Sequence, residues 1–298
     1  MAFNDRLNLQ LPESLSVRLQ EAYGEFFPRI MDGYQSIRPV TFRANTCKTT
    51  VENVISELTQ CGIQTKRAEW IKDALIAVDV REHALEETPL YARGEIYLQS
   101  LSSMLPPILL QPKAGEAILD MTAAPGGKTT QLYALSDGKA LITACERDSI
   151  RFERLKFNLE RQGATRVNAM RQDALTLNDF LRFDKILLDA PCTGTGTIAR
   201  GERIRFSEEY LFKCVRLQKK LFEKAFRLLK KGGTLLYSTC SVLPEENSGI
   251  ISFAKQLGAN LQPINISETL PRLPSAEGTV CICPSELYEG FFMAMFTK

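Results

Sequence analysis

A segment of small residues between an apolar run and a lysine has the composition of a ligand-binding loop. Residues 117–130 read AILDMTAAPGGKTT, in which the apolar run ends at Asp120 and two glycines precede Lys128. Small side chains let the backbone approach a ligand closely, and a helix that begins near Gly127 would offer unpaired amide groups to it. We predict a cofactor-binding loop made of Thr122, Ala123, Ala124, Pro125, Gly126, Gly127 and Lys128.

Part of this loop also matches the phosphate-binding loop of nucleotide hydrolases. Gly127, Lys128 and Thr129 fit the end of the pattern G-x-x-x-x-G-K-[ST], but Thr122 stands where its first glycine belongs. Further along, an apolar segment ends at Asp189, as a strand ends at the magnesium-binding acid of such enzymes. A nucleotide hydrolase in which Lys128 and Asp189 act on phosphate and magnesium is therefore an alternative.

Acidic residues that follow successive apolar segments favour a different ligand. They are Asp120, Glu146, Asp173 and Asp189. Glu146 lies about 20 residues beyond the glycines, where a carboxylate can accept hydrogen bonds from ribose hydroxyls. A triphosphate site needs no such set of anions. The acids suit a nucleoside of low negative charge, such as S-adenosylmethionine with its sulfonium cation.

Strands and helices alternate from about residue 111 onward, which is typical of a parallel sheet covered on both faces. A long helix is expected from about Ser207 to Leu229, ended by Gly232 and Gly233. The expected strands are 117–120, 140–144, 167–170, 185–188, 234–239 and 291–296. We predict an α/β fold with a doubly wound domain over residues 111–298 and its ligand site at the carboxyl ends of the strands.

Residues 1–110 are predicted to form a smaller N-terminal domain of helical and α+β structure. Short amphipathic helices are expected within 11–35, followed by a strand at 40–42, a helix over 51–58 and a strand at 74–80. Residues 101–110 are expected to connect the two domains. No aromatic ribonucleoprotein motif is present, so an RNA-contacting role and a packing role are both open for this domain.

Composition narrows the class of protein without identifying it. The 298 residues include 37 basic and 35 acidic side chains, so any nucleic-acid contact must come from local patches. The chain starts without a basic stretch leading into an apolar core, and no apolar run approaches the roughly 18 residues that a membrane span needs. We expect a cytoplasmic monomer with no membrane partner.

The eight cysteines are expected to be free thiols, because no export signal is seen. Cys281 and Cys283 are too close together in sequence for a usual zinc pair, and the only histidine, His83, lies far from them. We therefore predict no metal site.

Three further segments resemble motifs of one enzyme family. DMTAAPGGKT (120–129), FDKILLDAPCTGTG (183–196) and STCS (238–241) are similar to the cofactor, base-binding and nucleophile motifs of the Nol1/Nop2/Sun (RsmB/NOP) family of RNA cytosine-5 methyltransferases. RANT (43–46), YLQS (97–100) and EGFF (289–292) resemble flanking signatures, so the similarity reaches across most of the chain. It implies a Rossmann-like class I methyltransferase domain, S-adenosylmethionine as cofactor, and RNA, either tRNA or rRNA, as partner. Thr122 departs from the pattern, since members often have cysteine there.

The resemblance implies roles for two cysteines. C5 of cytosine is a poor nucleophile, and a thiolate added to C6 makes it enamine-like, so that it can take a methyl group from a sulfonium. Cys240 would be that nucleophile, and Asp189 would hold the base at its N3 and amine edge. Cys192 would assist loss of the C5 proton or release of the product. Lys128 would help electrostatically, because a thiol with a pKa of about 8.5 must become more acidic to react.

The family positions imply further contacts. Arg151 and Asp173 are predicted to contact the cofactor, with Asp173 receiving the adenine amine, and Asp189 also lies at the cofactor pocket. The predicted RNA-binding residues are Arg43, Asn45, Arg200, Arg203 and Arg205. Besides the hydrolase, two alternatives remain: a DNA cytosine-5 methyltransferase, which would use Cys192 as nucleophile, and a non-catalytic RNA-binding protein.

Overall fold

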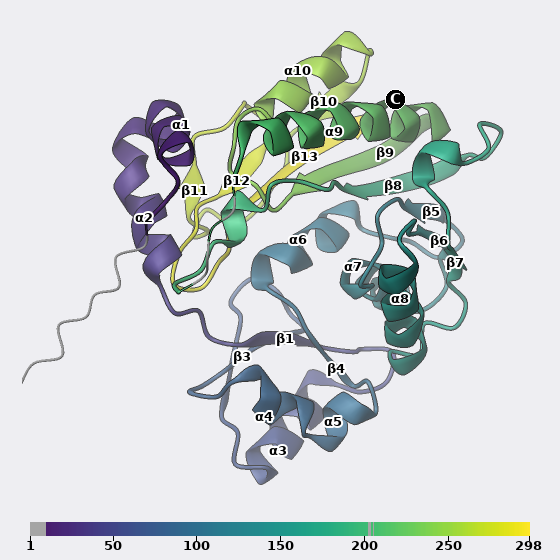
Figure 1. The fold of residues 1–298 in the computed structure, drawn as a ribbon. Coiled ribbons are helices and arrows are strands. Elements are labelled where there is room, and N and C mark those ends of the chain that lie inside the picture. Colours follow the sequence, from purple (N-terminus) through teal and green to yellow (C-terminus); the bar gives the residue numbers. More distant parts are fainter. Residues whose placement is uncertain (1–9, 202–203, 205) are drawn as a thin grey trace, which may run out of the picture.

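The computed structural model of the chain describes residues 10–201, 204 and 206–298, and it contains two sheets (Figure 1). The larger sheet has nine strands in the order β11-β12-β13-β9-β8-β5-β6-β7, with β10 paired to β13. Its strands are β5 (Ala117–Asp120), β6 (Leu141–Cys145), β7 (Asn168–Met170), β8 (Phe183–Asp189), β9 (Leu229–Thr239), β10 (Asn260–Gln262), β11 (Arg272–Leu273), β12 (Val280–Ile282) and β13 (Phe291–Thr297).

The order of the parallel strands places a ligand-binding crevice at one point of this sheet. β5 pairs in parallel with both β6 and β8, β6 pairs in parallel with β7, and β8 pairs in parallel with β9. The strand order therefore reverses between β5 and β8. In an open sheet of this kind, ligands bind beyond the carboxyl ends of the strands at such a switch point. β5 ends at Asp120 and β8 ends at Asp189.

Alternate residues of the central strands bury themselves on opposite faces of the sheet. Ile186 and Leu188 of β8 join a core with helix α9, whereas Leu187 between them joins a second core with helices α7 and α8. A parallel sheet covered on both faces requires apolar residues at successive positions, and KILLD supplies them. The helices of this domain are α6 (Leu101–Leu110), α7 (Gly127–Leu135), α8 (Ser149–Arg161), α9 (Glu208–Leu228) and α10 (Ser248–Gln256), with short 3₁₀ turns at η2 (Ala174–Thr176) and η3 (Thr195–Thr197).

The smaller sheet is antiparallel and lies below the larger one in Figure 1. Its order is β2-β3-β1-β4, and its core contains Phe42, Leu58 and Leu75. Its elements are β1 (Thr41–Ala44), α3 (Val51–Gln60), β2 (Thr65–Arg67), β3 (Ala74–Ala77), α4 (Glu82–Glu86), α5 (Pro89–Ala92) and β4 (Ile96–Leu98). The expected strands and helix of this unit are confirmed, but β2 and β4, of three residues each, are too short to be recognised from alternation.

Two N-terminal helices belong to the core of the larger sheet rather than to the small unit. They are α1 (Glu13–Tyr23) and α2 (Phe27–Gln35), joined by the 3₁₀ turn η1 (Gly24–Phe26). Leu19 and Ile30 are fully buried in the same apolar cluster as Phe222 and Phe292. Residues 101–110 are not an extended connection either, because they form helix α6, which packs on α7 and on β8, β9 and β13. Long-range packing therefore places α1, α2 and α6 on the large sheet, although all three precede its first strand in the sequence.

The long helix ends within one residue of its predicted end, but the two glycines do not end it. α9 stops at Leu228, and Leu229 already pairs with Phe183 of β8, so that Gly232 and Gly233 lie within β9. Leu229 is only 1% exposed, and this burial draws the backbone into the sheet before the glycines are reached. Glycine is permitted there because the register between β8 and β9 shifts at this point.

Candidate active site

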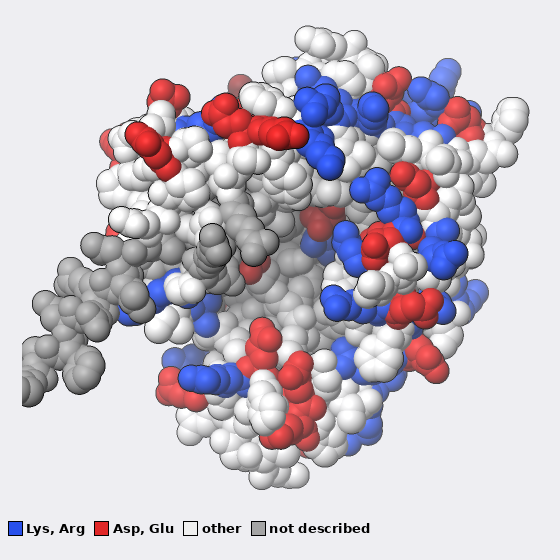
Figure 2. All heavy atoms as spheres, viewed as in Figure 1, with Lys and Arg blue, Asp and Glu red and all other residues white. Residues whose placement is uncertain are grey.

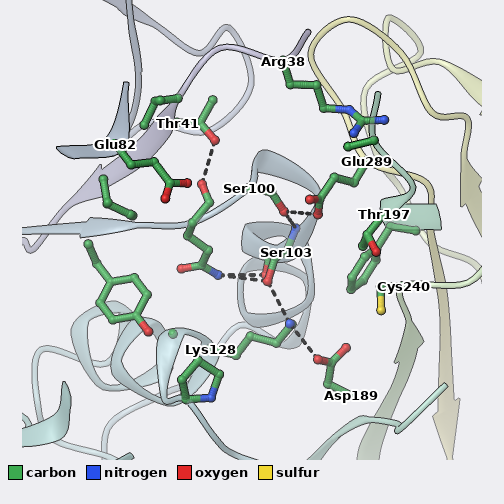
Figure 3. A pocket seen from close by; sticks show the side chains of 18 of the residues that line it. Arg38, Thr41, Glu82, Ser100, Ser103, Lys128, Asp189, Thr197, Cys240 and Glu289 are labelled. Carbon is green, nitrogen blue, oxygen red and sulfur yellow. Dashed lines mark hydrogen bonds and ion pairs between the residues drawn. The ribbon is translucent and has the colours of Figure 1, made fainter. Parts of the chain in front are cut away.

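A cleft of about 850 Å³ opens between the small unit and the carboxyl edge of the large sheet. Figure 2 shows it as the hollow in the middle of the molecule, and Figure 3 shows its interior. The predicted loop contributes Thr122, Ala123, Ala124, Pro125, Gly127 and Lys128 to its lining, which also includes Asp120, Asp189 and Cys240. Thr41, Tyr97 and Gln99 of the small unit form the facing wall. The structure thus brings the predicted loop and the predicted nucleophile into one cavity.

Local contacts hold the loop in its conformation. Gly126 has φ +110°, in the region that only glycine adopts readily, and a Cβ there would lie 3.0 Å from Leu155. The hydroxyl of Thr122 donates to the Asp189 carbonyl over 2.7 Å, and Arg151 donates to the Ala124 carbonyl over 2.9 Å. Because α7 begins at Gly127 without a side-chain cap, its first amide groups stay available to a ligand.

Two of the predicted cofactor acids, Glu146 and Asp173, follow the neighbouring strands β6 and β7. Each of them already has partners within the protein. Glu146 is 5% exposed, accepts a hydrogen bond from the Asp148 amide and pairs with Arg151 at 3.4 Å. Asp173 accepts from the Leu175 amide and lies 3.6 Å from Arg147. Each carboxylate has about four acceptor positions, so both retain capacity for the hydroxyls or amine of a nucleoside. These acceptors suit the hydroxyls and amine of an adenosine group, although neither carboxylate is among the residues that line the cleft. Arg151 holds Glu146 and the loop together.

Cys192 and Cys240 are brought together by two loops that are far apart in sequence. Their Sγ atoms lie 3.2 Å from each other. The Gly196 amide donates to the Cys240 carbonyl, and the Gly290 amide donates to the Gly196 carbonyl. A Cβ on Gly196 would lie 1.9 Å from the Gly290 oxygen and 2.9 Å from the Cys240 oxygen, so only glycine allows this approach. The hydrogen bond with Cys240, and then burial, raise the pKa of Cys192 well above its usual range. Cys192 therefore keeps its proton at neutral pH.

Lys128 and Asp189 form an ion pair near Cys240 (Figure 3). Lys128 Nζ lies 2.7 Å from Asp189 Oδ2 and donates to Ser103 Oγ over 2.8 Å, while Ser238 donates to Asp189 Oδ1 over 2.7 Å. Burial alone would lower the pKa of Lys128, but the charge and hydrogen bond of Asp189, with the nearby Cys240 and Asp120, raise it. The lysine is therefore a fixed cation at the site, and it orients Asp189.

A buried carboxylate that the sequence did not reveal supports the Cys192 loop. Glu246 is fully buried and accepts hydrogen bonds from the amide and hydroxyl of Thr193 and from Gln218 Nε2. Gln218 also donates to the Pro191 carbonyl over 2.9 Å. Contacts on both sides of Cys192 thus converge on Glu246. Its neighbour Glu245 pairs with Arg18 at the surface, and no local pattern distinguishes the two acids.

We expect Glu246→Gln to lower the catalytic constant about tenfold with little change in the KM for RNA. An amide presents NH₂ to donors that need an acceptor, so the loop that carries Cys192 loses one charge-assisted hydrogen bond. Steady-state kinetics of Glu246→Gln and of the surface control Glu245→Gln would measure this. A matching loss in both variants, or an increase in KM alone, would contradict a positioning role.

The burial of the Asp120 carboxyl makes the stability of the fold depend on pH. Burial, which the hydrogen bond from Thr129 only partly offsets, raises the pKa of Asp120 from 3.8 to about 6. Between those values the folded chain holds a proton that the unfolded chain has lost, so the free energy of unfolding falls as pH rises. Relative to Asp120→Asn, the native protein should lose about 2 kcal/mol of stability between pH 4 and about pH 6, out of about 3 kcal/mol for the whole shift. Urea unfolding of both proteins over this range tests the prediction, and parallel profiles would contradict it.

The predicted RNA contacts divide into three groups. Arg43 and Asn45 are 0% and 2% exposed, so their assignment to RNA is wrong. Arg43 donates to Gln99, to the Gly127 carbonyl and to Thr130, and Asn45 donates to the Gly94 and Gln162 carbonyls. Both join the small unit to the large domain. Arg200 lines the cleft. Arg203 and Arg205 lie outside the described residues.

Over residues 10–201, 204 and 206–298, no group of three or more histidine, cysteine, aspartate or glutamate side chains is placed to bind a metal ion. Within the same ranges, no helix combines the length and apolar character that crossing a bilayer requires.

The fold and cleft together define a Rossmann-like methyltransferase, and solved structures agree. A methyltransferase homologue from Pyrococcus horikoshii is 35% identical, with a TM-score of 0.85 over 98% of this chain and 97% of that one. NSun6 from Pyrococcus horikoshii, solved with SFG, has a TM-score of 0.87 over 96% of this chain at 24% identity, which shows a shared fold.

The pattern of the family described as 16S rRNA methyltransferase RsmB/F matches residues 107–297, and that of its ferredoxin-like domain matches residues 11–80. The chain belongs to this family. It is 34% identical over 280 residues to a human protein named 28S rRNA (cytosine(4447)-C(5))-methyltransferase, covering 88% of the chain and 34% of that protein. It is also 34% identical over 272 residues to ribosomal RNA small subunit methyltransferase F of Aeromonas salmonicida, covering 87% of the chain and 57% of that protein. The chain thus spans less than two thirds of the length of these curated relatives.

Proposed function

We propose that this protein transfers a methyl group from S-adenosylmethionine to C5 of a cytosine in ribosomal RNA. The observation that carries the proposal is the pair of sulfurs, 3.2 Å apart, beside the Lys128–Asp189 ion pair at the cleft. Family membership supports methyl transfer, and the names of the curated relatives favour rRNA over tRNA. Cys240, Asp189 and Cys192 are proposed to act in separate steps of the reaction.

Cys240 is the proposed nucleophile. It lines the cleft, and its thiolate adds to C6 of cytosine, forming an S–C6 bond while the C5–C6 double bond opens and its electron pair moves to C5. Its position supports this assignment, because Cys240 lines the cleft and Cys192 is not among the lining residues. The Cys192 thiol, 3.2 Å from the Cys240 sulfur, can donate a hydrogen bond to the Cys240 thiolate. Lys128 places a positive charge nearby.

Asp189 is proposed to hold the base edge. One of its oxygens bonds to Lys128 and the other to Ser238, and each retains a lone pair for the N3 proton or the exocyclic amine of cytosine. Negative charge that spreads from C5 towards N3 in the adduct is stabilised when N3 takes a proton from solvent and the resulting N–H donates a hydrogen bond to Asp189. Lys128 fixes the carboxylate in this orientation.

Cys192 is proposed to act after the new C5 bond has formed. The C5 proton passes to water, its C–H electron pair restores the C5–C6 double bond, and the S–C6 bond breaks to release Cys240 as a thiolate. Cys192, 3.2 Å from Cys240, is placed to assist this proton transfer or to protonate the departing sulfur. Glu246 adds to the raised pKa of Cys192, so its charge favours a protonated resting thiol.

The loop residues 122–128, with Glu146, Asp173 and Arg151, are proposed to hold S-adenosylmethionine. Glu146 would receive ribose hydroxyls, Asp173 the adenine amine, and the amides at the start of α7 the amino-acid carboxylate. When bound, this cofactor supplies a methyl group that is electrophilic because it is attached to a sulfonium. The Thr122 hydroxyl donates a hydrogen bond to the backbone carbonyl of Asp189. This bond connects the cofactor loop to the strand end that holds the base.

The alternatives receive less support from the geometry. A nucleotide hydrolase needs Lys128 to meet phosphate, yet Lys128 is bound by Asp189 and Ser103. A DNA enzyme would use Cys192 as nucleophile, but Cys192 is not among the residues that line the cleft, whereas Cys240 is. A non-catalytic RNA-binding protein would have no need for the Sγ atoms of Cys192 and Cys240 to lie 3.2 Å apart.

Calorimetry should detect binding of S-adenosylmethionine or S-adenosylhomocysteine, weakened at least tenfold by Glu146→Ala because ribose hydrogen bonds are lost. Magnesium-dependent binding of ATP with no response to adenosylhomocysteine would favour the hydrolase instead.

Activity is tested by incubating the protein with S-adenosylmethionine and either rRNA, tRNA or DNA, followed by bisulfite sequencing. New 5-methylcytosine in rRNA alone is the expected result, and modification of DNA alone would overturn the proposal.

A further inference from the structure

One stripe of helix α8 exposes apolar and basic side chains in alternation. Ile150, Arg154, Phe157 and Arg161 are spaced by four, three and four residues, which places them on one face of the helix. Ile150 is 68% exposed and Phe157 is 61% exposed, whereas the opposite face buries Phe152, Leu155 and Leu159. Packing therefore accounts for the inner face of α8 and leaves the outer apolar residues unexplained.

Three of these residues, Ile150, Arg154 and Phe157, line a second hollow next to the cleft. It has a volume of about 430 Å³, and its other lining residues are Pro125, Glu153 and Asn158. Pro125 and Asn158 also line the cleft, so the two cavities share a wall beside the cofactor loop. The hollow on α8 is therefore a neighbour of the cleft.

Charge around the hollow suits a phosphate backbone. Figure 2 shows Lys and Arg side chains, interspersed with acids, on the side of the central hollow where α8 lies in Figure 1. Glu153 is paired with Lys156, Arg151 with Glu146, and Arg147 with Asp173. Arg154 has no ion pair within the described part of the chain.

Arg161 stands at the junction with the cleft. Its guanidinium lies 4.0 Å from the ring centroid of Tyr91 and 5.4 Å from that of Phe157. Tyr91 and Arg161 both line the cleft, and Phe157 lines the second hollow. An arginine between two accessible rings is a common arrangement where unpaired bases stack and phosphates pass.

We infer that the hollow on α8 binds the base of an unpaired nucleotide next to the target cytosine, with Phe157 stacking on the base and Arg154 and Arg161 facing its phosphates. This inference rests on the proposed function, because it assumes an RNA substrate. The wall shared with the cleft, the Arg154 side chain in the lining, which is unpaired within the described residues, and Arg161 beside the Phe157 ring favour RNA over a protein partner or a second copy of the chain.

The test compares Phe157→Ala with the control Phe180→Ala. Phe180 is 90% exposed and precedes β8, at the amino-terminal edge of the sheet and away from the cleft. Fluorescence anisotropy with a short labelled single-stranded RNA containing one cytosine should show binding weakened about 5-fold to 100-fold by Phe157→Ala and unchanged by Phe180→Ala. Arg154→Gln should reduce the slope of log affinity against log salt by about 0.7.

Methylation separates this inference from the proposed function. With Phe157→Ala, the KM for RNA should rise while the single-turnover rate at saturating RNA stays within about twofold of the native rate. Unchanged affinity in Phe157→Ala would overturn the hollow as an RNA site, even if methylation itself is confirmed. A native protein that binds RNA through Phe157 but never methylates it would overturn the proposed function and not this site. Sedimentation showing a dimer that Phe157→Ala dissociates would assign the hollow to a second copy.

Discussion

Replacing Cys240 with alanine should abolish methyl transfer, whereas replacing Cys192 should leave the protein covalently attached to RNA. Cys240→Ala removes the atom that bonds to C6, so no adduct forms. Cys192→Ala retains that atom and removes the group that acts afterwards, so the adduct persists. The Sγ atoms lie only 3.2 Å apart, yet the two variants should behave in opposite ways.

A denaturing gel distinguishes the two outcomes. A slowly migrating, nuclease-sensitive band should appear with Cys192→Ala and be absent with Cys240→Ala. Each substitution removes one small thiol, so folding and cofactor binding should persist, and calorimetry with S-adenosylhomocysteine checks this. Cys214→Ala is a matched control, because Cys214 is buried in α9 outside the cleft. A trapped complex only when Cys240 is replaced would move the nucleophile to Cys192.

Replacing Asp189 with asparagine should lower the catalytic constant about 100-fold or more. Asparagine keeps the size of the side chain but loses its charge, and it leaves Lys128 as a buried cation without its counter-charge. The base edge then loses the acceptor that stabilises protonated N3 in the adduct, and removal of one such preorganised group typically costs this much in rate.

Single-turnover kinetics with saturating RNA and cofactor would measure the effect. Asp179→Asn is a suitable control, because Asp179 pairs with Lys224 and Arg227 and makes no contact with the cleft. If Asp189→Asn retained activity within about threefold of the native protein, the carboxylate would have no role in holding the base. Loss of cofactor binding alone would assign Asp189 to the cofactor pocket.

Most of the large domain follows from local pattern in the sequence. Apolar runs that end in an acid predicted β5 and β8, and the long helix was expected from about Ser207, whose side chain caps α9. The placement of α1 and α2 could not be predicted in this way. Their apolar faces are complementary to either domain, and only long-range packing against residues such as Leu211 selects the large one.

Arg43 shows a second limit of local pattern. An arginine in a strand of mixed residues is typical of a surface contact, and the flanking RANT segment resembles a family signature. In the structure its guanidinium is enclosed by Gln99, Tyr97 and the start of α7, and burial lowers its pKa to about 10. Those partners lie more than 50 residues away in the chain, so only the docking of the two sheets converts Arg43 into a link between them.

The sequence by itself determined the chemistry of this protein: a loop of small residues, acids that end successive strands, and two cysteines within motif segments. Each of these depends on residue type and on short spacings, which the chain carries locally. Only the tertiary structure decided which groups meet. The 3.2 Å approach of Cys192 and Cys240, the burial of Glu246 behind them and the pairing of Lys128 with Asp189 join residues 48 to 61 positions apart. Such contacts arise when parallel strands align their carboxyl ends at one edge of the sheet, which local spacing does not encode.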